Sequence, residues 1–116
     1  FSALGVERFA LSCDELERAE KTRESWSVAD LEIGFGFDPA QAPAWRLFVS
    51  EPTFPKEPSR FVEPGLFLVQ AGGRILYAAV QSMPFARPDL GEMLEAIDFI
   101  KSRESPPRGD VAPKTL

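Results

Sequence analysis

The chain has 116 residues, 44% of them hydrophobic and 27% charged, a composition that predicts a single folded domain and excludes a disordered tail. Its net charge of -5 argues against nucleic acid as a partner, and no apolar run reaches the roughly 18 residues of a membrane helix. The single cysteine excludes an internal disulfide and favours a reducing, cytoplasmic location. The absence of histidine excludes a Ser-His or Cys-His catalytic pair within this chain.

The first third of the chain predicts a strand, a surface helix and a second short strand. Residues 6–11 are mostly apolar, as expected of a strand. Ser12 or Asp14 can cap the next helix, residues 15–26, whose acidic first turn complements the positive end of the helix dipole. This helix is highly charged and is expected on the surface. Residues 31–36 form a further short apolar segment.

The middle of the chain predicts a short helix and a long loop. Asp38 followed by Pro39 is a helix start signal, so residues 39–47 are expected to be helical despite Pro43. Residues 50–62 contain three prolines among charges, which favours an extended surface loop. Such a loop is either a connector or a mobile cover over a site. We favour a connector, because the segment offers no chemistry.

The last third predicts a hairpin and a helix. Two apolar strands, residues 66–70 and 75–80, flank a Gly72-Gly73 turn, where glycine reaches positive φ without a steric clash. Residues 89–100 carry apolar side chains spaced for one helix face: Leu90, Met93, Leu94, Ile97 and Ile100. We expect one domain over residues 1–109, followed by a polar tail at 110–116.

Several motifs in this order resemble one protein family. The segments are 5–14, 31–36, 63–67 (EPGLF), 81–88 (QSMPFARP) and 107–109 (PRG). Together they are similar to a bacterial peroxiredoxin-like branch of the alkyl hydroperoxide reductase and thiol-specific antioxidant family. The likeness spans about residues 5 to 109. It does not include the first strand, the cysteine-bearing loop and most of the first helix of that family.

The resemblance implies an α/β fold, a thioredoxin-like three-layer sandwich with a mixed sheet, incomplete at its amino terminus. In the family order, residues 33–35 are outermost, followed by 6–11, the absent strand, 67–70 and 75–80. The absent strand is therefore central, and each backbone group left buried and unpaired would cost about 1 to 3 kcal/mol. Three alternatives stay open: an upstream segment fills the gap, another chain supplies the strand in a homo-oligomer, or the sheet closes in an arrangement that differs from that of the family.

Cys13 is the one side chain with intrinsic redox reactivity. It follows a predicted strand and precedes a helix, a position that lowers the pKa of a thiol. The negative charges of Asp14, Glu15 and Glu17 oppose thiolate formation. The resemblance places the family's nucleophile in the absent loop. We therefore favour a structural thiol over a catalytic one, with Cys13 kept as a candidate.

Glu63, Pro64 and Gly65 are the candidate substrate loop. In thioredoxin-like folds a proline that opens the antiparallel strand is often cis, and the loop before it faces the reactive cysteine and can pair with an extended substrate. Sequence alone favours a trans bond, because few X-Pro bonds in folded proteins are cis. The resemblance implies cis. The structural alternative is a trans proline that merely begins a strand.

We expect no metal and no cofactor. The acidic groups on residues 15–20 and 89–95 are better interpreted as solvated helix faces than as paired catalytic carboxylates. Residues 34–36 lack the third glycine and the following helix of a phosphate-binding loop.

Two functions remain open. The first is a thiol-dependent oxidoreductase that reduces peroxides or disulfides, with its nucleophilic cysteine upstream of Phe1 and a thiol as its reductant. The second is a redox-inactive thioredoxin-like module that binds a partner through the proline loop or an open sheet edge. In either reading, the 116 residues alone are not expected to turn over peroxide.

Overall fold

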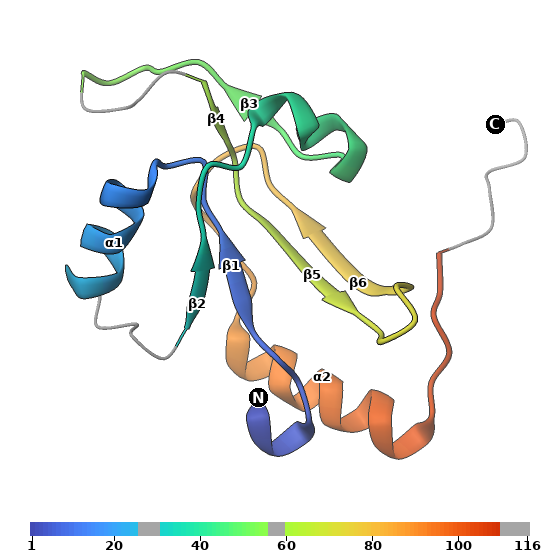
Figure 1. The fold of residues 1–116 in the computed structure, drawn as a ribbon. Helices are drawn as coiled ribbons and strands as arrows, with labels where there is room; N and C mark the ends of the chain where they lie inside the picture. Colours follow the sequence, from blue (N-terminus) through green and yellow to red (C-terminus); the bar gives the residue numbers. More distant parts are fainter. Residues whose placement is uncertain (26–30, 56–59, 110–116) are drawn as a thin grey trace, which may run out of the picture. The chain divides into compact units, whose positions relative to one another are not determined.

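The computed structural model describes residues 1–25, 31–55 and 60–109 of the chain (Figure 1). They divide into two compact units, Phe1–Glu63 and Pro64–Leu116. Each unit combines helix with short strand pairs, so the α/β class is confirmed. Within the described ranges no helix is long and apolar enough to cross a membrane.

The first unit contains a parallel strand pair. After the short 3₁₀ helix η1 (Ser2–Leu4), strand β1 (Phe9–Leu11) pairs with β2 (Glu32–Gly34) in parallel, with Ala10 opposite Ile33. The pairing continues past β1, because the Ser12 N–H donates to the Gly34 carbonyl at 2.9 Å. Both strands lie inside their predicted segments.

Helix α1 (Leu16–Ser25) connects the two parallel strands and contacts β2. Ala19 is buried, whereas Leu16 at the start of the helix is exposed. The helix is therefore a surface helix, as predicted. Trp26, the last residue of the predicted helix, lies outside the described residues.

The predicted helix after Asp38 is present as the 3₁₀ helix η2 (Pro39–Trp45). The Asp38 carboxylate accepts a hydrogen bond from the Ala40 N–H at 2.9 Å and so caps the first turn. Pro43 lies inside the helix and has no N–H to donate, and short 3₁₀ turns suit such a segment. Ala42 is fully buried, and η2 contacts strand β4.

The proline-rich segment is not wholly a loop. Strand β3 (Val49–Ser50) pairs antiparallel with β4 (Phe61–Val62), so both ends of the predicted loop belong to a ladder. Two residues on each strand are too few for an alternating pattern to be recognised in the sequence. Residues 56–59, which include one of the prolines, lie outside the described part.

The second unit contains the predicted hairpin. Strand β5 (Gly65–Val69) pairs antiparallel with β6 (Ile75–Val80) (Figure 1). Gly73 in the turn has φ of 87°, which is the left-handed geometry that glycine was expected to supply. Although both strands are apolar throughout, their side chains are half-buried or exposed.

Helix α2 (Leu90–Arg103) follows the hairpin, and the Asp89 carboxylate caps it by accepting from the Glu92 N–H at 3.0 Å. Met93 and Ile97 are buried, as the helical spacing predicts. Leu90 is 55% exposed, so it does not share their environment. The reason is its place as the first helical residue, which puts it at the end of the apolar face.

The described residues contain three sheets of two strands each. The pairs β1 with β2 and β5 with β6 are neighbours in the expected strand order, whereas the pair β3 with β4 was not predicted. A single mixed sheet that includes a central strand remains a proposal.

Candidate functional site

The predicted substrate loop falls, along the sequence, where the first unit ends and the second begins. Glu63 ends the first unit, and Pro64 and Gly65 begin the second. Every described peptide bond is trans, so the cis Glu63–Pro64 bond implied by the resemblance is wrong for this structure. The trans form is the intrinsically favoured one, by about 0.5 to 1 kcal/mol for an X-Pro bond.

Pro64 leads directly into the hairpin. Its carbonyl accepts a hydrogen bond from the Gln81 N–H at 3.0 Å, one step beyond the pair of Gly65 with Val80. Pro64 is half-buried and Gly65 is exposed. The missing N–H of Pro64 costs no ladder bond, because proline begins the strand.

Glu63 is the buried charged residue of the described structure, with 8% of its surface exposed. Its Oε1 accepts a hydrogen bond from the Ser50 hydroxyl at 2.7 Å, across the β3–β4 ladder. Its backbone N–H donates to the Phe48 carbonyl at 2.8 Å and extends that ladder by one residue. The sequence identified Glu63 by its motif, but the partner Ser50, 13 residues earlier, was not predicted.

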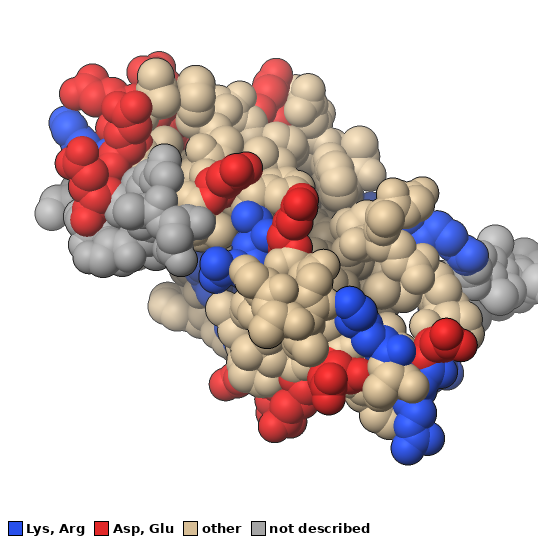
Figure 2. Space-filling model, turned by 60° about the horizontal axis from the view of Figure 1, so that its bottom comes forward, with Lys and Arg blue, Asp and Glu red and all other residues tan. Residues whose placement is uncertain are grey.

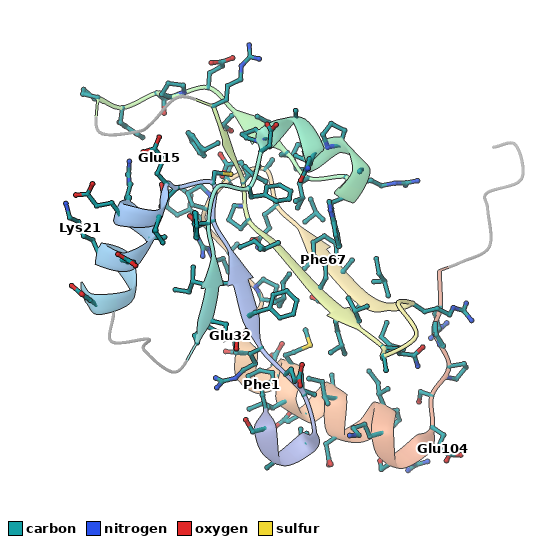
Figure 3. All side chains as sticks on the ribbon, in the orientation of Figure 1. Phe1, Glu15, Lys21, Glu32, Phe67 and Glu104 are labelled. Atoms are coloured by element: carbon teal, nitrogen blue, oxygen red, sulfur yellow. The ribbon has the colours of Figure 1, made fainter. Side chains whose placement is uncertain are left out.

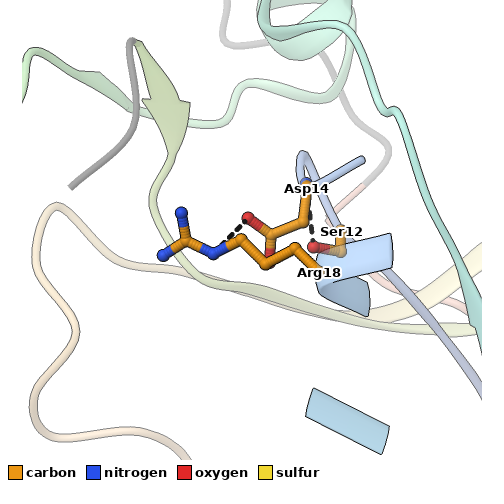
Figure 4. Close-up of polar contacts among 3 residues, drawn as sticks. All are labelled: Ser12, Asp14 and Arg18. Atoms are coloured by element: carbon orange, nitrogen blue, oxygen red, sulfur yellow. Dashed lines mark hydrogen bonds and ion pairs between the residues drawn. The ribbon is translucent and has the colours of Figure 1, made fainter. Parts of the chain in front are cut away.

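Cys13 lies between β1 and α1, at the carboxyl end of the parallel pair, and is half-buried. Its neighbours form a local polar turn (Figure 4). The Asp14 N–H donates to the Ser12 hydroxyl at 3.0 Å, and the Asp14 carboxylate is 3.3 Å from Arg18 Nε. Arg18 is thereby paired with the carboxylate of the residue that follows Cys13 in the sequence. The interpretation of Cys13 as a structural thiol stays a prediction.

The acidic groups on the two helices are solvent-exposed. On α1, Glu17 and Lys21 form an exposed ion pair of 3.1 Å, and Figure 3 shows Lys21 extending outward from the helix. Figure 2 shows acidic side chains in several separate groups on the surface, with basic side chains among them. Among the residues that the structure describes, no group of three or more His, Cys, Asp or Glu is placed to hold a metal.

The loop between β6 and α2 is held by its own side chains. Gln81 donates through Nε2 to the Ala86 carbonyl, and Arg87 donates through Nε to the Pro84 carbonyl at 3.1 Å. Ala86 has φ of 55°, a left-handed conformation that is uncommon for a residue other than glycine. Phe85, between these contacts, is 71% exposed. The motif in this loop was noticed in the sequence, but its internal hydrogen bonds were not predicted.

A shallow open depression lies in the first unit near β3. The Arg60 guanidinium at its edge is 2.6 Å from Glu51, so its charge is already balanced. The depression is lined by Asp38, Pro39, Ala40, Val49, Glu51, Pro52 and Arg60. This arrangement offers neither a nucleophile nor a proton-transfer pair.

Comparisons with protein-family models, with curated proteins and with solved structures find no match to this chain. The functional argument therefore depends on the residues and on the geometry of the candidate loop.

Proposed function

We propose that this chain is part of a peroxiredoxin-like, thiol-dependent oxidoreductase domain with a thioredoxin-like fold, acting in the cytoplasm on peroxides or disulfides. The nucleophilic cysteine would lie upstream of Phe1. The residues present would supply the scaffold and the substrate loop of Glu63, Pro64 and Gly65.

The supporting observation is the order of the pairings along the chain. A parallel pair, β1 with β2, is followed by an antiparallel hairpin that opens with Pro64, and then by the amphipathic helix α2. This is the order that the resemblance implies for the segments after the family's cysteine loop. The pairing of residues 9–11 with 32–34 joins two of the segments that carry the resemblance, in the neighbour order that the resemblance implies.

The chemistry would proceed in three balanced steps. The thiolate attacks one peroxide oxygen, the O–O bond breaks, and the alcohol leaves after taking a proton, so that sulfur is oxidised to a sulfenic acid. A thiol reductant then condenses with the sulfenic acid to give a mixed disulfide and water. A second thiol restores the cysteine by disulfide exchange.

A peroxide consumption assay tests the proposal. The 116-residue chain and a version extended upstream along the natural gene product would be compared, with a thiol reductant present. We expect activity in the extended version and none in the shorter one. Equal activity in both would show that Cys13 is the working thiol, and inactivity in both would contradict the oxidoreductase proposal.

A second candidate function is a redox-inactive binding module, and the exposed apolar side chains of β1 favour it. Phe9 is 70% exposed and Leu11 is 61% exposed. A strand with exposed apolar side chains and an open edge can pair with a strand of another chain. A gene product with no cysteine upstream of Phe1 would favour this function. The test compares the oligomeric state of the wild-type protein with that of a Phe9→Lys variant. If a second copy pairs with β1, the wild type is an oligomer and the variant is a monomer.

A further inference from the structure

Glu63 is buried, whereas most of the large apolar side chains of the described residues are not. It is 8% exposed, whereas Phe9 on β1 is 70% exposed. Burial of a carboxylate is unfavourable unless hydrogen bonds compensate it, so a buried Glu is not maintained by hydrophobic packing. Its burial needs a specific reason in the surrounding structure.

The geometry of the β3–β4 ladder supplies that reason. Val49 lies opposite Val62 and Ser50 opposite Phe61, so Ser50 and Glu63 are diagonal neighbours on one face. A long side chain can span a diagonal, and here the Ser50 hydroxyl donates to Glu63 Oε1 at 2.7 Å. The pair therefore connects the carboxyl ends of the two strands.

The main chain at Glu63 is held by further constraints. Its N–H donates to the Phe48 carbonyl at 2.8 Å, and the following proline restricts the conformation of the residue before it. Pro64 itself has a fixed φ. The backbone conformation at Glu63 is therefore restrained by the ladder hydrogen bond and by the side-chain contact with Ser50.

We propose that Ser50 and Glu63 are a positioning pair that holds the start of the substrate loop, so that its backbone is preorganised for an extended substrate. The inference rests on the proposed function and deepens it. Neither side chain reacts. The pair acts by holding the main chain of residues 63–65. It contributes to the binding of an extended disulfide substrate and not to that of hydrogen peroxide, which is too small to contact the loop along its length.

The test uses the natural gene product that contains this chain and two substrates, hydrogen peroxide and a short oxidised peptide disulfide, with glutathione as reductant. Ser50→Ala removes the donor, and Ser50→Thr keeps a hydroxyl and is the rescue variant. Glu51→Gln changes the adjacent exposed carboxylate and is the control.

We expect Ser50→Ala to lower kcat/KM for the peptide disulfide about tenfold and to leave kcat/KM for hydrogen peroxide within about twofold of wild type. Ser50→Thr and Glu51→Gln should retain wild-type values with both substrates. An equal loss with both substrates would show a purely structural role and would overturn the inference, as would no loss at all.

A measurement without turnover separates the two proposals. Hydrogen exchange at the Glu63 amide should be about tenfold faster in Ser50→Ala and unchanged in Glu51→Gln. If the wild type reduces neither substrate, the proposed function fails, and the inference that depends on it fails too. If the wild type is active but exchange at Glu63 does not change, the positioning pair alone is wrong.

Discussion

The β5–β6 hairpin and the β3–β4 ladder are both antiparallel, but they form for different reasons. The hairpin strands are separated by a short turn with Gly73 in a left-handed conformation, so the pairing is local. The β3–β4 strands are joined by a long proline-rich segment and pair over only two residues each. A hydrogen bond from the half-buried Ser50 to the buried Glu63 accompanies that pairing. Local turn geometry directs the first pairing, and contacts between distant residues direct the second.

The largest effect is expected from the non-local ladder. Ser50→Ala removes a hydrogen bond to a buried carboxylate, so we expect the free energy of unfolding to fall by about 2 kcal/mol. Urea denaturation measures this value. Ser102→Ala is a control, because Ser102 also donates through its hydroxyl but is exposed. Equal effects of the two substitutions would show that the burial of Glu63 does not matter for stability.

The hairpin turn should respond to the loss of glycine at Gly73, where φ is positive, and not at its neighbour Gly72. Gly73→Val places a β-branched residue at positive φ, which we expect to lower the free energy of unfolding by about 1.5 kcal/mol. Gly72→Ala is the matched control, because no atom lies within 4 Å of an added Cβ and its φ is not positive. A stable Gly73→Val variant would mean that the turn does not depend on left-handed geometry.

The cap of α2 gives a smaller, purely local effect. Asp89→Ala removes the acceptor for the Glu92 N–H, and we expect a loss of about 1 kcal/mol in the free energy of unfolding. Asp89→Asn retains an oxygen acceptor and should recover most of the loss. Circular dichroism during urea denaturation would follow both variants, and no recovery with Asn would exclude capping as the cause.

The smallest effect is expected at the exposed ion pair beside β3. Arg60→Ala should lower the free energy of unfolding by less than about 0.5 kcal/mol, because both side chains of the Arg60–Glu51 pair are mostly exposed and screened by water. The loss should become smaller with added salt, because salt screens an exposed ion pair. A loss as large as that of Ser50→Ala would show that this pair, and not the buried one, stabilises the β3–β4 ladder.

The candidate site was predictable only in part. The motif at residues 63–67 directed attention to Glu63, Pro64 and Gly65. The residues by themselves favour the trans state of Pro64, and only the resemblance implied the cis form that the structure contradicts. The contact of Glu63 with Ser50 was not predicted, because a hydrogen-bond partner 13 residues away depends on where distant segments lie.

Elements with a local signal were determined by the sequence itself. Asp38 and Asp89 precede the helices they cap, and the apolar strands flank a glycine turn, because caps and turns involve residues only a few positions apart. The tertiary structure alone decided which short segments pair, that η2 is a 3₁₀ helix, and that Glu63 is buried while Leu90 is exposed. Burial and non-local pairing depend on the packing of segments distant in sequence, which a local pattern does not specify.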